Sequence, residues 1–530
     1  MVEGARAPRG ASLADPDRGT MPGESGSGLN SRRRPHEVKL ARRLARRIED
    51  DIARDGWRVG TSYASETDLL ERYGVSRAVL REAIRLVEHH GVATMRRGRR
   101  GGLVLRAPDA APLTIAVVVY LEYIGTTIED LLEVRMLVEP LAARLAAQAL
   151  TEDNIVSLRR VLAAERERGE LDPAARGQLH RLLGSLGGNP ALSLFVDVLC
   201  ELTTRYATVP PAQDAAHTRA LCADSDRAHA AIVEAIVAGD AALAERRMLR
   251  HLTAMRDWLL STSQEPIARR PSLALAAPGG GKLAETVARR LMSEIIASGA
   301  RVGEIFGSET ELQARLDVSR AVFREAIRLL EYHSVARMRR GPYGGLVISE
   351  PDPSASIDAM AVYLDYRGVD AAQLRVVRDV AELGAIGLLV ARGTDGSRGA
   401  ALRAAHQVTA ATPPEQVAAL SHHFHLRIAE LAGNQILALF LQIMLTVSAR
   451  HAGAPVPPGE DRWPADADAP APGIPPAVQP TPEATPEAGT EAGTVHDVHG
   501  RILEAILAGD GPLAQYRMRR HLQALDAWWA

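Results

Sequence analysis

Three arginines spaced four residues apart are the first side chains in this sequence that could do chemistry. Arg77, Arg81 and Arg85 stand in the stretch VSRAVLREAIRLVEHHGV, at 75–92. Guanidinium groups pair with phosphate oxygens and with the acceptor edge of guanine, so a helix that carries such a row could read the major groove of DNA. The same row is also typical of a solvated surface helix, and the flanking sequence must decide between the two.

This stretch occurs twice. VSRAVFREAIRLLEYHSV, at 318–335, follows the first copy by 243 residues and matches it at 14 of 18 positions. Arg320, Arg324 and Arg328 repeat the row of arginines. The chain therefore contains an internal repeat, and both copies should have the same local structure.

Each copy predicts a helix that starts after a capping serine, Ser76 or Ser319, and buries one face. The apolar positions recur with the period of an α-helix; they are Leu80, Ala83, Ile84 and Val87, and Phe323, Ala326, Ile327 and Leu330. A short helix should precede it, at 65–73 and 308–316, and Ser308 and Glu311 have the spacing of a capping box. Two helices joined in this way predict a helix-turn-helix.

A basic, glycine-rich segment follows each copy, at 95–104 and 338–347, and is typical of a β-hairpin wing. This order of motifs resembles the DNA-binding domain of the GntR family of bacterial transcription regulators. The resemblance implies winged helix-turn-helix domains at 36–107 and 282–350. DNA contacts are then expected from Ser76, Arg77, Arg81, Arg85, Arg99, Arg100, Ser319, Arg320, Arg324, Arg328 and Tyr343.

The remainder of each half reads as helical, and its motifs recur in the same order. IEDLLEVRMLVEPLAARLAA aligns with AAQLRVVRDVAELGAIGLL and pairs Arg135 with Arg378. HAAIVEAIVAGD and HGRILEAILAGD form another pair. These motifs are similar to the all-helical FCD effector domain of the FadR branch of the GntR family. The expected fold is thus mainly α: two winged helix-turn-helix domains, each followed by an FCD-like bundle, at 108–262 and 351–530.

The resemblance to FCD domains implies an effector site built on histidines. Such domains typically bind a metal through an aspartate and a histidine one helical turn apart and two later histidines. The corresponding histidines are His180, His229 and His251 in the first half, and His425, His499 and His521 in the second. Three imidazoles can hold Zn²⁺ or a similar ion with a position open for the carboxylate of a small organic acid.

The family aspartate is missing from both halves, because Arg176 and Ser421 stand in its place. A guanidinium would repel a cation, so we expect a divalent metal such as zinc only in the second effector domain, with His422 as a possible fourth ligand. In the first domain, Arg176 and Arg135 could instead meet an anionic effector directly, as Arg378 could in the second. No cofactor is certain on this basis.

Charge is distributed unevenly along the 530 residues. The net charge is −2, yet residues 32–106 carry +9 and residues 282–350 carry +2, so positive charge is concentrated in the two predicted DNA-binding domains. Cys200 and Cys222 fit neither a disulfide framework nor a zinc cluster by spacing. Neither a signal peptide nor an apolar run of membrane-spanning length is evident, which predicts a cytoplasmic protein without a membrane partner.

Three segments should lie outside the domains: a disordered tail at 1–35, a linker at 263–281, and a disordered Pro/Ala-rich insertion at about 452–494. The insertion follows from spacing, since His425 and His499 are 74 residues apart whereas His180 and His229 are 49 apart. GGGK at 279–282 resembles a phosphate-binding loop but lacks the leading glycine and the final Ser or Thr.

The sequence as a whole predicts a transcription regulator that binds an imperfect palindrome in double-stranded DNA. One chain carries both DNA-binding domains, at 36–107 and 282–350, which we call the first and second head. A small acid would modulate it, and further self-association is possible. Two alternatives stay open: a metal-dependent enzyme that uses the histidine clusters, and an effector-blind protein that bridges DNA sites.

Overall fold

The computed structural model describes residues 35–96, 98, 101–168, 173–206, 215–262, 283–332, 334–339, 341, 344–451 and 488–529. The expected linker, nearly all of the expected tail and most of the expected insertion lie outside these residues. So do the wing residues Arg99, Arg100 and Tyr343, whose DNA contacts remain predictions.

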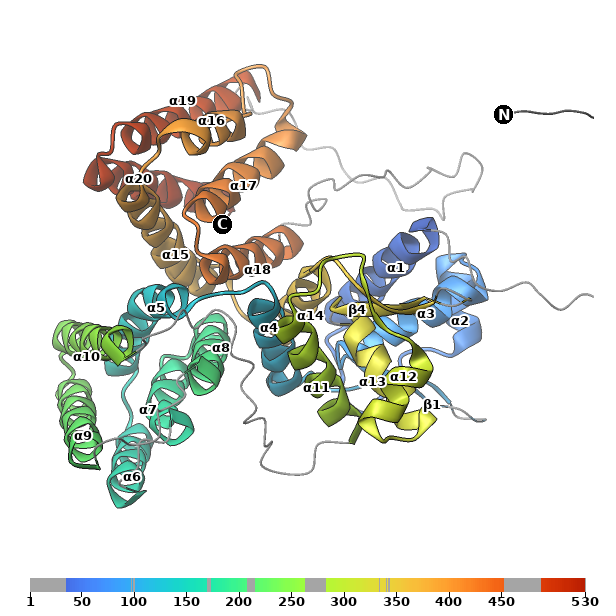
Figure 1. Cartoon of the computed structure of the whole chain (residues 1–530). Helices are drawn as coiled ribbons and strands as arrows, with labels where there is room; N and C mark the ends of the chain where they lie inside the picture. Colours follow the sequence, from blue (N-terminus) through green and yellow to red (C-terminus); the bar gives the residue numbers. More distant parts are fainter. Residues whose placement is uncertain are drawn as a thin grey trace, which may run out of the picture.

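The two halves of the chain repeat one order of elements (Figure 1). The first head consists of α1 (Pro35–Arg54), α2 (Glu66–Tyr73), α3 (Arg77–His89), β1 (Ala93–Arg96) and β2 (Gly102–Leu105). The second consists of α11 (Leu283–Ser298), β3 (Ile305–Gly307), α12 (Glu309–Leu316), α13 (Arg320–Tyr332), β4 (Ala336–Arg339) and β5 (Gly345–Ile348). The predicted winged helix-turn-helix is confirmed in both.

Local interactions explain where the helices of the heads begin and turn. The Ser76 hydroxyl accepts a hydrogen bond from the Val79 amide at 3.3 Å, and Ser308 and Glu311 form the expected capping box. Gly74 ends α2 in the left-handed conformation at φ 60°, where glycine meets no steric penalty. The apolar faces of α3 and α13 are buried, as their periodicity predicts.

Each wing is an antiparallel hairpin. Ala93 pairs with Leu105 in the first head, and Ala336 pairs with Ile348 in the second. The second head has one strand that the sequence did not indicate, because β3 joins the free edge of β5. At the same place in the first head, Ser62 forms only an isolated bridge with Val104.

The helical domains follow the heads. The first comprises α4 (Ala110–Tyr123), α5 (Ile128–Gln148), α6 (Glu152–Arg168), α7 (Pro173–Leu186), α8 (Pro190–Tyr206), α9 (Ala215–Val237) and α10 (Ala241–Thr262). The second comprises α14 (Ser354–Tyr366), α15 (Ala371–Arg392), α16 (Gly396–Ala405), α17 (Pro414–Leu431), α18 (Gln435–His451), α19 (Ala488–Leu507) and α20 (Gly511–Trp529). Among the described residues, no helix combines the length and the apolar character needed to cross a membrane.

The expected end of the insertion was wrong by several residues. Helix α19 already begins at Ala488, so residues 488–494 are helical. The last proline before this helix is Pro486, and from Ala488 onward the sequence contains no residue that would interrupt the backbone hydrogen bonds of a helix at its first turns.

One apolar core joins the two helical domains. It contains residues of α4, α5 and α8 from the first half together with α14, α15 and α18 from the second. The rings of Phe195 and Phe440 stack at its centre with centroids 4.0 Å apart. Two equivalent asparagines also form hydrogen bonds between the halves. The Asn189 amide donates to the Gln373 carbonyl at 2.7 Å, and the Asn434 amide donates to the Asp130 carbonyl at 2.9 Å.

Each head rests on the helical domain of the other half, and Figure 1 shows α4 and α14 between the heads and the bundles. Val362 of α14 belongs to the core of the first head, and Val119 of α4 to the core of the second. The Tyr123 hydroxyl donates to the Ser349 carbonyl at 2.9 Å. On the other side, Arg46 forms an ion pair with Asp358. The contacts between head and bundle are thus exchanged between the halves.

Truncation of one ring in the shared core should destabilise both halves together. We expect Phe440→Ala to lower the free energy of unfolding by about 3–5 kcal/mol, because it removes a fully buried ring and leaves a cavity. Denaturant unfolding followed by circular dichroism would measure it, with the partly exposed Leu513→Ala as the control. A transition that splits in two, with one half unchanged, would contradict a shared core.

Candidate DNA interface and effector sites

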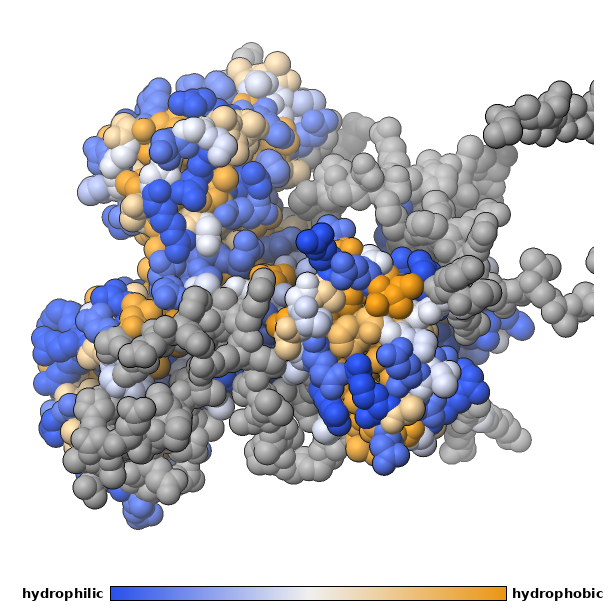
Figure 2. All heavy atoms as spheres, in the orientation of Figure 1, coloured by the Kyte–Doolittle hydropathy of each residue, from blue (hydrophilic) through white to orange (hydrophobic). Residues whose placement is uncertain are grey.

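The recognition arginines lie where a DNA-reading helix needs them. Arg77, Arg81 and Arg85 are exposed on α3, opposite the face that packs into the head. Arg320, Arg324 and Arg328 occupy the same places on α13. Figure 2 shows hydrophilic side chains over the outer surface of α12 and α13. Both heads therefore present guanidinium groups on a helix of suitable size for a major groove.

The two rows of arginines differ in their partners. Arg320 and Arg324 both pair with Glu309 on α12, at 3.3 and 3.4 Å. Among the residues that the structure describes, Arg77 and Arg81 have no carboxylate partner, although Glu66 stands at the position of Glu309. Arg85 and Arg328 behave alike, each with a glutamate three residues earlier on its own helix. The second head thus neutralises part of its own reading surface.

The first histidine cluster joins three helices of the first domain. His180 comes from α7, His229 from α9 and His251 from α10, and one ligand atom of each lies within 4.8 Å of the other two. The Nε2 atoms of His229 and His251 are 3.2 Å apart. Glu139 of α5 accepts a hydrogen bond from the Nδ1 atom of His180.

The second cluster has the same construction from α17, α19 and α20. The His521 Nε2 atom lies 3.2 Å from that of His425 and 3.1 Å from that of His499. Glu382 of α15 supports the Nδ1 atom of His425, as Glu139 supports His180. All three imidazoles are buried.

Both clusters fit a divalent metal. A tetrahedral ion with metal–nitrogen bonds of zinc length requires nitrogen atoms about 3.3 Å apart. One separation in the first cluster and two in the second are close to this value, and the remaining ones are within 4.8 Å. Burial lowers the pKa of His180. Burial and the neighbouring imidazoles lower the pKa values of His251 and His499 well below their ordinary range. The same two causes lower the pKa of His521 to about 3. A lowered pKa favours the neutral imidazole, which is the form that binds metal.

Two arginines expected at the effector site of the first domain already have carboxylate partners. Arg176 does not stand unpaired beside the cluster, because it forms a 2.9 Å ion pair with Asp226 of α9. Arg135 is also committed, since its guanidinium binds Glu139 and donates to the Thr203 hydroxyl at 3.1 Å. The buried Nε atom of Arg176 has no hydrogen-bond partner among the described residues. Whether these arginines meet an anion, and whether this domain lacks a metal, therefore stay predictions.

The second domain leaves one guanidinium partly available. Arg378 binds Glu382 through Nε, but its buried Nη2 atom has no hydrogen-bond partner in the described part of the chain. Ser421 lies beside the cluster, with its hydroxyl 3.4 Å from the Nε2 atom of His499. His422 is not one of the three residues whose ligand atoms converge. Burial and, as a smaller effect, the charge of Arg378 lower the pKa of His422 to about 3.

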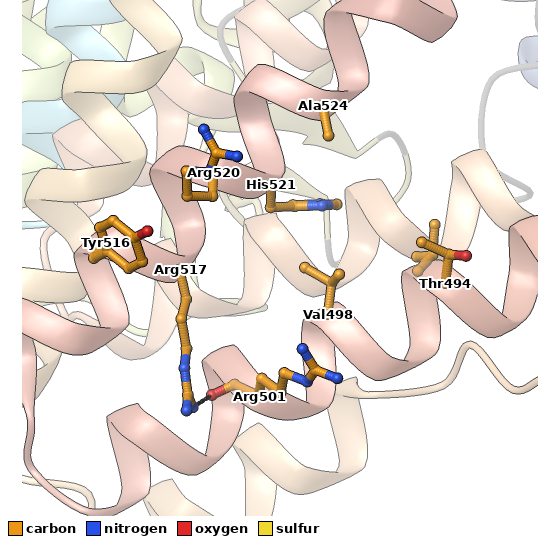
Figure 3. Close-up of a pocket in the computed structure, with 9 residues that line it drawn as sticks. Thr494, Val498, Arg501, Tyr516, Arg517, Arg520, His521 and Ala524 are labelled. Atoms are coloured by element: carbon orange, nitrogen blue, oxygen red, sulfur yellow. Dashed lines mark hydrogen bonds between the residues drawn. The ribbon is translucent and has the colours of Figure 1, made fainter.

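A cavity of about 430 Å³ opens between α19 and α20, and His521 forms part of its wall (Figure 3). It is lined by Thr494, Val495, Val498, Arg501, Tyr516, Arg517, Arg520, His521 and Ala524. Arg517 donates to the backbone carbonyl of Arg501, while the guanidinium of Arg520 lies on the other side of α20 in this view. The cavity gives a route from the surface to one face of the second cluster.

Sequence reasoning missed the carboxylates that support the histidines. Glu139 and Glu382 could have been found, because an arginine and a glutamate four residues apart recur in both halves. Glu165 and Asp226 carry no such signal, since Val408 or Ala410 stands at the position of the first and His496 at that of the second. Glu139 and Glu382 face the Nδ1 atoms, away from the converging Nε2 atoms, so they orient the histidines.

Comparison with known proteins agrees with this arrangement. The model described as "Bacterial regulatory proteins, gntR family" matches residues 40–102, and the FCD domain model matches residues 130–254 and again 373–465. The Uxu operon regulator of Haemophilus influenzae is 27% identical over 217 residues, 40% of this chain and 78% of that protein. The HTH-type transcriptional repressor NanR of an Enterobacter species is 27% identical over 241 residues, 43% of this chain and 88% of that protein.

A solved structure of a Streptococcus agalactiae GntR protein is 24% identical and covers 41% of this chain and 99% of its own, with a TM-score of 0.28. The Uxu operon regulator and NanR each match most of their own length but less than half of this chain. The fold and these families define a DNA-binding transcription regulator and not an enzyme. Within that class, the chain belongs to the GntR family and carries the FCD domain in each half.

Removal of the carboxylate that holds Arg320 and Arg324 should strengthen DNA binding by the second head. We expect Glu309→Gln to raise operator affinity about two- to fivefold, the effect of an exposed ion pair worth up to about 1 kcal/mol. Glu66→Gln is the matched control and should have less effect. For the same reason Arg81→Ala should weaken binding more than Arg324→Ala, and equal losses in a titration at fixed salt would contradict the assigned asymmetry.

Proposed function

We propose that this regulator acts as a single-chain pseudo-dimer: its two heads bind an imperfect palindrome, and a small carboxylate effector in the helical domains modulates that binding. The shared core between the two halves is the observation that carries the proposal. In a homodimer, two identical chains would build such an interface. Here one chain supplies both sides of it.

The heads favour an imperfect palindrome over an exact one. The exposed residues of α3 and α13 that would meet DNA first are the same in type and spacing, so the central contacts of each half-site should be alike. The wings differ, with Arg99 and Arg100 in the first and Tyr343 in the second, so contacts outside the central bases should be unlike.

A route for the effector signal follows from the packing. α5 and α15 carry Glu139 and Glu382, which hold the first histidine of each cluster. The same two helices contribute to the shared core together with α4 and α14, on which the heads rest. A ligand that moves a histidine helix would therefore shift the supports of the heads, a coupling of the order of 1–3 kcal/mol in such systems.

The sites favour a small acid as the effector. A metal bound by three imidazoles would supply a Lewis-acidic position for a carboxylate oxygen. Arg378 would add a guanidinium donor to that carboxylate, since its buried Nη2 atom has no partner among the described residues. An effector-blind bridging protein, the second candidate, would not need a buried donor left unused at this cost.

The stoichiometry on DNA tests the pseudo-dimer. We expect one chain per palindrome when the purified protein is mixed with fragments from around its own gene and the mass of the complex is measured in solution. Two chains per palindrome would show that each half pairs with another molecule and would overturn the proposal. A scrambled fragment of equal length controls for binding through phosphates alone.

The effector is tested separately by thermal stabilisation. With Zn²⁺ present, we expect a member of a panel of small mono- and dicarboxylic acids to raise the melting temperature and change operator affinity, because it binds the folded state. Arg378→Lys keeps the charge beside Glu382 but removes the Nη2 donor. It should therefore weaken binding of the acid and leave DNA binding intact. Arg375→Gln, one turn earlier, is the control. Stabilisation that Arg378→Lys leaves unchanged would contradict the assigned role.

A further inference from the structure

We infer that the two histidine clusters are unequal metal sites, and that the first effector domain binds the metal more tightly because Glu165 fixes a second of its three histidines. The inference rests on the proposed effector site and adds which half is loaded first. It reverses the expectation from the sequence, which placed a metal only in the second half.

In the first domain, two carboxylates hold two of the ligands. Glu139 accepts from the Nδ1 atom of His180, and Glu165 of α6 accepts from the Nδ1 atom of His229 at 2.7 Å. Both glutamates are buried. Each contact keeps the proton on Nδ1 and turns the lone pair of Nε2 toward the centre of the cluster, which raises the basicity of the ligand and fixes its ring.

The second domain has only one such contact among its described residues. Glu382 holds His425, but the Nδ1 atom of His499 is buried without a hydrogen-bond partner there. The ring of His499 stacks on Phe424 with centroids 4.3 Å apart, which positions the ring but not its proton. His499 can therefore carry its proton on Nε2, the nitrogen that a metal needs.

The difference arises from the length of one helix. Glu165 lies on α6, which has 17 residues, whereas its counterpart α16 has only 10 and ends at Ala405. The offset between the halves is 243 residues before this segment and 245 after it, so the counterpart of Glu165 is Val408 or Ala410. Both lie beyond the end of α16, in a segment that leads to two prolines. An apolar side chain thus stands in place of the carboxylate.

The charge around the clusters points the same way. Glu139, Glu165 and Asp226 accompany two guanidiniums in the first domain, so carboxylates exceed cations by one. In the second, Glu382 and Arg378 balance. A divalent cation therefore gains more from the first environment. At limiting metal, only the first domain should be loaded.

A metal titration of the full-length chain tests this. The protein, stripped with a chelator and dialysed, is titrated with Zn²⁺ against a chromophoric chelator. We expect two steps of one ion each; His251→Ala should remove the tighter and His521→Ala the weaker. Glu165→Gln should weaken the tighter step about 10- to 100-fold, the usual cost of losing such a support. The exposed Glu167→Gln on the same helix is the matched control.

Three results would overturn the inference: equal affinities, a tighter step that His521→Ala removes, or a tighter step that Glu165→Gln leaves unchanged. Circular dichroism of each variant excludes unfolding as the cause. Operator binding by the same preparations tests the pseudo-dimer separately from the metal sites. If one chain binds the operator but no Zn²⁺ binds to the chain, the proposal of a pseudo-dimer stands and the inference of unequal metal sites fails.

Discussion

Burial of apolar surface between the two halves is the constraint on which the rest of the structure depends. The helices α4, α5 and α8 contribute buried apolar side chains to one core together with α14, α15 and α18. Each set covers the other, with Phe195 against Phe440. Since both sets are on one chain, this association does not depend on protein concentration, and the two heads are held at a separation that the core determines.

Burial also explains how the charged groups near the histidines are arranged. A carboxylate in an apolar bundle is costly unless it is paired and hydrogen-bonded. Burial would raise the pKa of Glu139, but the charge of Arg135 and the hydrogen bond from His180 lower it. In the same way, Arg378 and His425 lower the pKa of the buried Glu382 to about 2. In each half the arginine, the glutamate and the histidine therefore form one unit. The arginine and the histidine offset the cost of burying the carboxylate, and the carboxylate fixes the imidazole ring.

The sequence was sufficient for the features that repeat locally. Capping serines, the apolar faces of α3 and α13, and the glycine-rich wings each follow from a spacing within one short stretch, and so does the recurrence of three histidines. It was insufficient where a partner comes from a distant element. Asp226 neutralises Arg176 across 50 residues, and Glu165 reaches His229 across 64. Neither pairing has a periodic signal, so the sequence showed the charge of Arg176 but not the carboxylate that pairs with it.

Fusion of the halves changes what substitutions can do. In a homodimer every change appears at both symmetric positions, so the two sites must remain identical. In one chain they can diverge, and three of the differences concern charged groups. Met292 stands where the first head has Glu49, which is buried 2.6 Å from His90. Glu309 pairs with the recognition arginines of the second head, whereas Glu66 makes no such pair among the described residues, and an apolar residue stands in place of Glu165. The shared core is what permits this divergence, because it keeps the halves together whatever happens at either site. In the scheme that we propose, one half holds a metal more firmly than the other, and each half passes its state to the head that rests on it.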